Sequence, residues 1–308
     1  MLKPLATSEE GAAPCRPILV PFQYRYLYRM SAARDLFTQA TTYDTLGDVY
    51  HTVKLCKRAI KLDPDYAPPY RLLGRVYHER QEWKPCLHYY QRYVALRPRA
   101  RDAWPYIGLA ATALRQWRTA RTAWNHLGHD LPLTARPPQL APEIVGVRCK
   151  HRGQREILWA RRLDPVRAEL LSLPQLPTSL NYGDTVLFDL DKVGERMLPG
   201  GRVPVHPFLE QTDTRFYRTH RVRLYTESAA PIERLQELCR AANLGFDNWS
   251  AATRQITGKG LTEYYGRELL QATEHILPLV GIATRRPEQL EEVLEAWRVI
   301  TFCDWELG

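Results

Sequence analysis

The front third of the chain carries apolar and polar residues at the spacing of an α-helix. Tyr70, Leu73, Gly74 and Tyr77 recur at i, i+3, i+4 and i+7, which places them on one helical face. Large aromatic residues on such a face fill the space between packed helices. We therefore interpret this face as core, and the pattern predicts amphipathic helices in this part of the chain.

The same pattern returns with a period of 34 residues. Three kinds of residue keep this interval: Pro64, Pro98 and Pro132; Trp83 and Trp117; and Gly74 and Gly108. Such a period is typical of stacked helical hairpins, because one hairpin cannot bury its apolar face alone. A proline lacks the N–H that continues a helix, so each of the three predicts the end of a second helix.

Two of the repeated units can be compared position by position. The units are Tyr70, Leu73, Gly74, Tyr77, Cys86, Tyr90, Tyr93 and Pro98, and then Trp104, Ile107, Gly108, Ala111, Ala120, Trp124, Leu127 and Pro132. They resemble the tetratricopeptide repeat (TPR) family. An earlier unit is weaker, with Thr52 and Cys56 where a small residue and an aromatic are usual. The resemblance covers about residues 33–132, and it implies three helical hairpins with a groove that binds another polypeptide.

In that family the groove is lined by the first helix of each hairpin. The resemblance therefore assigns the following residues to a partner-binding groove: Phe37, Thr41, Asp44, Arg71, Arg75, His78, Tyr106, Leu109 and Thr112. Arg71 and Arg75 lie one helical turn apart, so we expect both guanidinium groups to project together and to suit a carboxylate. The alternative is that both arginines pair with neighbouring acids or water.

Two segments flank the predicted repeat domain, which spans residues 31–132. Residues 1–30 are expected to be partly disordered and to end in an aromatic segment, 22–30, that caps the first repeat. Prolines crowd residues 133–142, which we interpret as a linker.

Beyond the linker the period of the pattern changes from 3.6 to 2. Alternating or β-rich runs occur at residues 143–149, 156–161, 168–172, 185–190, 203–206 and 215–225. They predict a small, mostly antiparallel sheet or a partial barrel over residues 143–215. Pro204 and Pro207 are expected to confine their strand to an edge, because proline cannot donate to the ladder.

The last part, residues 216–308, contains two similar blocks. Pro231 leads to Phe246 and Pro287 leads to Phe302, each over 15 residues, and each block follows a strand-like run. They predict a duplicated strand–helix–strand arrangement, for which a ferredoxin-like split βαβ sheet is the favoured fold. Residues 261–276 are predicted to form an additional helix between the two blocks. The fold class is thus an α-solenoid followed by an α+β domain, residues 143–308.

A second resemblance is faint. Residues 158–163 and 181–184 are weakly similar to a bacterial domain family of unknown function. This similarity implies a bacterial source and names no activity.

Net charge is distributed unevenly. The chain carries +9 overall, and residues 1–134 hold 20 Lys plus Arg against 11 Asp plus Glu, a balance of +9, while the remainder is neutral. A basic array attracts acidic peptides or nucleic acid through its long-range field. The short apolar run at residues 17–22 does not match a signal or a membrane span, so we expect a cytoplasmic protein without membrane contact.

Candidate chemistry is sparse. The six cysteines form no CxxC pair, so we expect free thiols, no metal site and no cofactor. His206 and His220 with Asp184, Asp189 and Asp191 are the nearest approach to an active site, but turn aspartates are common for their local backbone bonds. No catalytic residue is assigned. Gly258-Lys259-Gly260 lacks the further residues of a phosphate-binding loop.

These observations favour a non-enzymatic adaptor whose groove binds a protein or peptide, with an acidic peptide suiting the basic array. Two alternatives remain open. The first is binding of RNA or another nucleic acid by the basic repeat half. The second is an enzyme in the C-terminal α+β domain.

Overall fold

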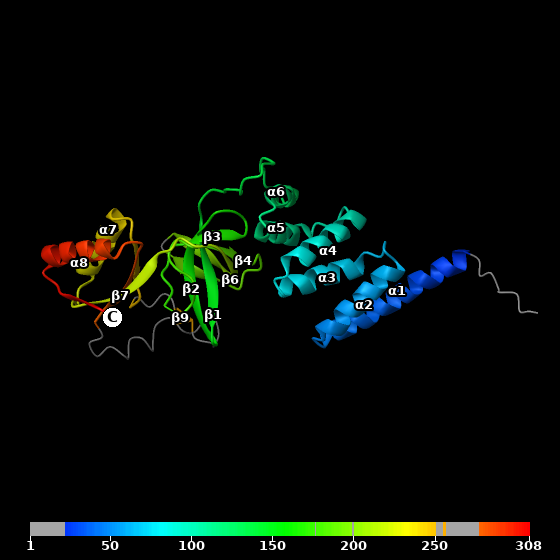
Figure 1. Ribbon diagram of the computed structural model, residues 1–308, viewed down its shortest axis with the longest axis horizontal. Helices are drawn as coiled ribbons and strands as arrows, with labels where there is room; N and C mark the ends of the chain where they lie inside the picture. The colour runs from blue at the N-terminus through cyan, green and yellow to red at the C-terminus, as the bar shows by residue number, and fades with distance from the viewer. Residues whose placement is uncertain (1–21, 176, 199, 251–254, 257–276) are drawn as a thin grey trace, which may run out of the picture.

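The structure is a computed structural model that describes residues 22–175, 177–198, 200–250, 255–256 and 277–308. Its three parts follow one another along the long axis of the molecule (Figure 1): a helical array, a β-barrel, and a smaller unit of two helices on a sheet. The predicted helix at residues 261–276 and the Gly258-Lys259-Gly260 turn lie outside the described residues.

The helical array consists of three consecutive hairpins. They pair α1 (Phe22–Thr45) with α2 (Val49–Leu62), α3 (Pro68–Glu79) with α4 (Trp83–Leu96), and α5 (Trp104–Ala113) with α6 (Trp117–His126). Prolines stand in the first turn of α3 and of α5, where a missing N–H is harmless. The TPR-like arrangement of hairpins predicted from the 34-residue period is therefore present, and residues 22–30 belong to α1 itself.

The repeated glycines mark the closest helix crossings. A Cβ atom on Gly74 would lie 2.8 Å from the ring of Tyr90, and one on Gly108 would lie 2.6 Å from the ring of Trp124. No side chain fits at such distances without displacing the ring, so each hairpin closes around a glycine and an aromatic residue.

The repeated prolines act as helix stops in only two of the three hairpins. Pro64 and Pro98 follow the ends of α2 and α4 at Leu62 and Leu96. The last helix, α6, ends well before Pro132, at a turn where Gly128 has a φ of +99°. Such a backbone conformation favours glycine, so the third hairpin is terminated by Gly128.

The barrel follows the linker. Its strands are β1 (Ile144–His151), β2 (Gln154–Arg162), β3 (Arg167–Leu170), β4 (Thr185–Phe188), β5 (Gly194–Leu198) and β6 (Gly201–Asp213), with β9 (Gln255–Ile256) added to β2. Antiparallel pairs run in the order β1-β2-β3-β4-β6, and a parallel pairing between β1 and β6 closes the ring. Val145, Val147 and Phe188 are among the buried residues of the core within it.

The prediction that Pro204 and Pro207 lie on an edge strand is wrong. In β6, Pro204 is paired with Glu195 of β5, and Pro207 is paired with Arg148 of β1. Closure of the ring places this part of β6 between two neighbouring strands. A proline removes one N–H and keeps its carbonyl, so the strand loses single ladder bonds there and remains paired.

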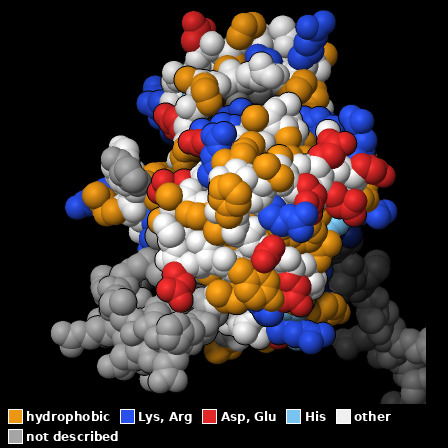
Figure 2. Space-filling model, turned by 90° about the vertical axis from the view of Figure 1, so that its left-hand side faces the viewer, with side chains coloured by type: hydrophobic (Ala, Val, Ile, Leu, Met, Phe, Trp, Pro, Cys, Tyr) orange, Lys and Arg blue, Asp and Glu red, His pale blue; other side chains and the backbone are white. Residues whose placement is uncertain are grey.

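The C-terminal unit contains a four-stranded antiparallel sheet. Its elements are β7 (Arg218–Leu224), α7 (Ala229–Ala241), β8 (Gly245–Asn248), β10 (Leu279–Thr284), α8 (Pro287–Thr301) and β11 (Trp305–Leu307), and the strand order is β11-β7-β10-β8. Both helices pack on one face, where the indole of Trp297 donates to the carbonyl of Pro231 at 2.6 Å. Figure 2 faces this end of the molecule and shows hydrophobic side chains among acidic and basic ones.

The two predicted blocks of this unit are not equivalent at their ends. Phe246 lies in β8 and packs against the core, whereas Phe302 caps α8 in the left-handed conformation, with a φ of +58°, and is 92% exposed. The two blocks therefore share the spacing from proline to phenylalanine but differ in structure at the phenylalanine.

Buried free thiols account for most of the described cysteines. Burial raises the pKa of these thiols to about 12, so they stay protonated at neutral pH: Cys56, Cys86, Cys149 and Cys239. They act as small apolar core residues.

Candidate functional site

A cavity of about 920 Å³ lies on the inner side of the helical array. Residues of all three hairpins line it, from α1, from α3 and α4, and from the turn that leads into α5 and α5 itself: Phe37, Thr41, Ala67, Pro68, Arg71, Leu72, Arg75, Tyr90, Tyr93, Leu96, Arg97, Pro98, Arg99, Ala100, Asp102 and Tyr106. We call this the array cavity. Five of the residues assigned to the groove from the sequence line it, namely Phe37, Thr41, Arg71, Arg75 and Tyr106.

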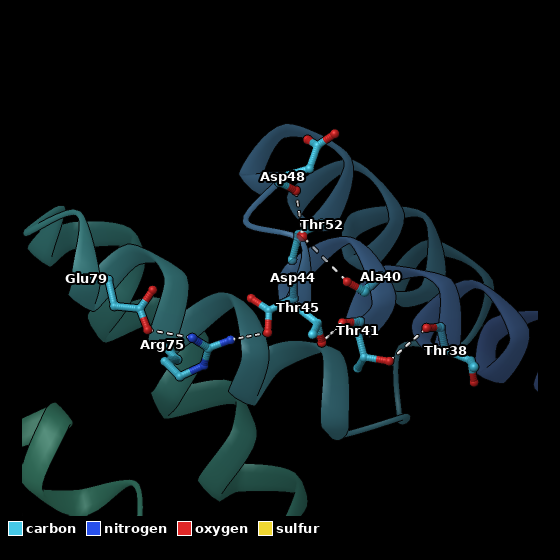
Figure 3. Close-up of polar contacts among 9 residues, drawn as sticks. All are labelled: Thr38, Ala40, Thr41, Asp44, Thr45, Asp48, Thr52, Arg75 and Glu79. Atoms are coloured by element: carbon cyan, nitrogen blue, oxygen red, sulfur yellow. Dashed lines mark hydrogen bonds and ion pairs between the residues drawn. The ribbon is translucent and has the colours of Figure 1, made fainter.

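Arg75 is held by acids of its own surroundings. Its guanidinium donates to Asp44 of the first hairpin and to Glu79 one turn along α3, each at 2.5 Å (Figure 3). Partial burial lowers the pKa of Arg75, but the bonds to Asp44 and Glu79 outweigh it and raise that pKa above its ordinary value. Asp44 is thus joined to the cavity through Arg75.

Arg71 points to the other neighbouring hairpin. Its Nε donates to Asp102, ahead of α5, at 2.8 Å, with both side chains about half exposed. The two arginines therefore do not project together, contrary to the expectation from their spacing. Arg71 ties the middle hairpin to the third, and Arg75 ties it to the first. Exposed pairs of this kind contribute little stability each, about 0.2–1 kcal/mol.

Two further arginines line the array cavity without such partners. Arg97 and Arg99 are exposed in the turn after α4, on either side of Pro98. Within the part of the chain that the structure describes, neither forms an ion pair. They are therefore the cationic groups of the cavity that are available to a ligand.

Aromatic rings form the apolar part of the cavity. Tyr90 stacks on Tyr106 with centroids 5.0 Å apart and planes 7° from parallel. Phe37 meets Tyr66 edge to face at 5.7 Å. A wall of fixed rings beside free guanidinium groups suits a chain with both apolar and anionic groups.

Besides Asp44, the three other residues assigned to the groove are buried outside the cavity. Leu109 and Thr112 of α5 are 0% and 1% exposed, and the hydroxyl of Thr112 donates to the carbonyl of Gly108. His78 is also buried, with its Nε2 3.6 Å from a carboxylate oxygen of Asp189 in the barrel. These three residues therefore do not line the array cavity.

The barrel packs against the third hairpin. Val166, Leu187, Leu190 and Leu209 of the barrel belong to the same apolar cluster as Leu109 and Trp124. At the rim, the indole of Trp83 donates to Glu210 at 3.1 Å, and Arg115 donates to Asp213 at 2.9 Å. The barrel therefore covers the face of α5 that would be open in an array standing alone.

The linker is fixed by one buried cation. Arg121 of α6 is 6% exposed and donates to three carbonyl groups, that of Pro132 just before the linker and those of Arg136 and Pro137 within it. Such bonds satisfy a charge that is costly to bury unpaired. They set the path by which the chain enters the barrel.

The acids and histidines of the barrel do not converge on one point. Asp184 is fully buried and accepts bonds from the backbone N–H groups of Asn181 and Arg215 and from the amide of Gln211. Burial raises its pKa and these three bonds lower it, with a net rise. His206 lies in the barrel, whereas His220 belongs to β7 in the C-terminal unit. Among the described residues no group of three or more side chains is placed to hold a metal ion.

Several cavity residues were not assigned from the sequence. Tyr90 and Tyr93 belong to α4, and Arg97, Arg99 and Asp102 belong to the turn that follows it. The sequence contained a signal for Arg97 and Arg99, because they flank the repeated Pro98. The groove residues were assigned only from the first helix of each hairpin, so the turns between hairpins were left out.

Comparison with known proteins gives structural likeness only. No protein-family model matches the chain, and a search of curated proteins finds no match, so the similarity to a bacterial domain family is not confirmed. The chain is similar to the first TPR domain of Spaghetti (RPAP3) bound to the HSP90 peptide SRMEEVD, at 16% identity over 32% of this chain and 78% of that chain, with a TM-score of 0.30.

Two further likenesses have similar scores. One is the TPR2B domain of yeast Sti1 in complex with pHsp70, with 17% identity over 31% of this chain and 77% of that chain and a TM-score of 0.29. The other is a hypothetical protein from Neisseria gonorrhoeae, with 9% identity over 55% of this chain and 94% of that chain and a TM-score of 0.26. The TPR-like architecture therefore rests on the three hairpins and their spacing in this chain.

Among the residues that the structure describes, none of the helices combines the length and the hydrophobicity needed to cross a bilayer.

Proposed function

We propose that this chain is a non-enzymatic adaptor that binds an acidic segment of a partner protein in the array cavity. The observation that carries the proposal is the pair Arg97 and Arg99, exposed beside the stacked rings of Tyr90 and Tyr106. Carboxylates of a partner would bind the guanidinium groups, and apolar side chains would rest on the rings. The array's net positive charge would also speed encounter with such a partner.

The proposal narrows the groove to one part of the array. Phe37, Thr41 and Tyr106 would contact the partner, while Arg71 and Arg75 would hold the hairpins in register through Asp102 and Asp44. His78, Leu109 and Thr112 have no free surface for it. The bound segment would therefore be short and would lie over the first two hairpins and the start of α5.

For the C-terminal unit we infer a ferredoxin-like fold. The strand order β11-β7-β10-β8, with every pair antiparallel and with α7 and α8 on one face, supports it. The unit would supply a second contact surface, and its role in the adaptor is independent of the cavity.

The test uses a random peptide library displayed on phage and selected on the immobilised full-length protein. Selected peptides should be rich in Asp and Glu, and fluorescence anisotropy should give a Kd at least tenfold higher for the double variant Arg97→Glu and Arg99→Glu. Two exposed charge pairs of about 0.5–1 kcal/mol each, replaced by repulsion, amount to such a factor. A matched control is Arg58→Glu with Lys61→Glu on α2, outside the cavity, with the same change in charge.

Two results would contradict the proposal. One is a selection without acidic enrichment, and the other is an equal loss of affinity in both double variants. A single-stranded RNA that binds more tightly than any selected peptide, with a Kd that rises steeply with salt, would favour nucleic-acid binding instead.

A further inference from the structure

A short turn of the barrel contacts the array at the residues that the TPR resemblance assigns to the groove. The turn consists of Asp189, Leu190 and Asp191, directly after β4, and we call it the acidic turn. We propose that the acidic turn is an internal occupant of the groove, which a longer partner segment must displace. This inference rests on the proposed function, because it assumes that the array cavity is the binding site.

Two residues of the acidic turn, Asp189 and Leu190, contact the array. A carboxylate oxygen of Asp189 lies 3.6 Å from Nε2 of His78, and the two side chains are only 16% and 10% exposed. Leu190 packs on the apolar cluster that contains Leu109. Burial raises the pKa of the Tyr106 hydroxyl, and the charges of Asp191 and Asp189 add to that rise.

The contacts of the acidic turn adjoin the array cavity. Tyr106 lines the cavity, stacks on Tyr90, and meets the ring of His78 edge to face at 5.0 Å. One ring therefore separates the open cavity from the position of the acidic turn. The occupant has the same chemistry as the proposed partner, an apolar side chain between two carboxylates.

The barrel presents the acidic turn in a fixed shape. The N–H of Asp189 donates to the carbonyl of Pro207 at 2.9 Å, and Nδ1 of His206 lies 2.8 Å from the carbonyl of Asp189. Within the turn, the N–H of Asp191 donates to one carboxylate oxygen of Asp189 at 3.4 Å, and the other oxygen is the one near His78. A preorganised segment on the same chain acts at a high effective concentration, so it competes with an incoming peptide.

The consequence is that the groove exists in a short form and a long form. In the structure the acidic turn lies against His78, and Leu190 packs on the apolar cluster of the third hairpin, so the cavity is short. When the turn is released, His78 becomes available and the cavity extends past Tyr106 toward the third hairpin. The apparent affinity of a long partner segment is then reduced by the fraction of molecules in which the turn is bound.

The experiment uses the full-length chain and a fluorescein-labelled peptide of residues 185–194, which contains the acidic turn. The triple variant Asp189→Ala, Leu190→Ala and Asp191→Ala vacates the position in the full chain. We expect this peptide to bind the triple variant at least tenfold more tightly than the wild-type chain. A peptide of the same composition in scrambled order should change by less than twofold, which separates occupancy from a change of charge.

The matched control is Glu291→Ala with Glu292→Ala on α8, which removes two negative charges from an exposed helix face. Its affinity for the peptide should equal that of the wild-type chain. Should the triple variant fail to fold, the isosteric Asp189→Asn should still bind the peptide at least threefold more tightly than the wild-type chain.

Three results would overturn the inference: equal affinity of the wild-type and vacated chains, an equal gain for the scrambled peptide, or no binding by the vacated chain at about 5 mM peptide, a concentration in the range of tethered segments. No partner takes part in this test. The two proposals can fail separately. If the peptide binds the triple variant more tightly, but the Arg97→Glu and Arg99→Glu variant binds selected peptides as well as the wild-type chain, the acidic turn occupies the groove and the proposed function is wrong.

Discussion

The two ends of the helical array differ in what covers their inner face. At the first two hairpins the inner face is open, and partly exposed ion pairs such as Arg75 with Asp44 hold neighbouring hairpins together. At the third hairpin the inner face is covered by the barrel, and Leu109 and Leu187 share one core. The open end keeps surface available for a partner, and the covered end gains stability from apolar burial at the expense of that surface.

The largest expected effect concerns the shared core. Replacing Leu187, which is fully buried, by Ala should lower the free energy of unfolding by about 2–5 kcal/mol, because it leaves a cavity between barrel and array. Urea unfolding followed by far-UV circular dichroism would measure it. We expect the helical signal to shift to lower urea together with the β signal.

A control lies at the open end. Leu46 is 74% exposed between α1 and α2, so Leu46→Ala should change the free energy of unfolding by less than about 0.5 kcal/mol. An equal, small effect of both substitutions would show that the covered end is no more tightly packed than the open one.

The second prediction concerns stability at low pH and His206, whose ring bonds the backbone of the acidic turn. Burial, with a smaller contribution from the charge of Arg162, lowers the pKa of His206, although its bond to the Asp189 carbonyl opposes this shift. The native state therefore binds a proton less readily than the unfolded chain. Stability should be complete above pH 6.5, the ordinary value, and should fall as the pH drops below it, by at most about 1.4 kcal/mol per pH unit for this group.

Thermal unfolding between pH 7.5 and pH 5 would test this expectation, with His206→Gln as the comparison. The variant should lose less stability over this range than the wild-type chain. His220, whose pKa is also lowered by burial, lies in the C-terminal unit and should keep its own share of the acid effect in both proteins. If the wild-type chain and the His206→Gln variant lose stability equally between pH 7.5 and pH 5, His206 does not contribute to the loss of stability at low pH.

The smallest expected effect belongs to the open end. Asp102→Asn removes the charge that pairs with Arg71, and both side chains are about half exposed, so the loss of stability should stay below about 1 kcal/mol and shrink further in high salt. Chemical denaturation at low and high salt would measure it. A loss above 2 kcal/mol would mean that this pair holds the hairpins together more than its exposure suggests.

The repeat region was the most predictable from the sequence. A Cβ atom on Gly74 or Gly108 would lie under 3 Å from the ring of Tyr90 or Trp124, and so close a crossing accepts no other residue. Such a requirement leaves a strict period in the chain. The groove was predictable only in part, because the assigned positions describe an array that stands alone, and here Leu109 is buried in a core shared with the barrel.

The barrel illustrates the limit of local patterns. Alternation predicted most of its strands, but Pro204 in a paired strand and the parallel closure of β1 on β6 depend on residues far apart in the chain. A period of two describes one strand and its faces, and it carries no information about which strand lies beside it.

By itself the sequence determined the hairpins, their period and the basic charge of the array, because helix packing and net charge depend on residues close together in the chain or on composition alone. The tertiary structure decided which part of the groove is open. Arg71 turns to Asp102, Arg75 turns to Asp44, and Asp189 reaches His78 from the barrel. Each of these contacts joins residues from different hairpins or different domains, and only the folded arrangement brings them together.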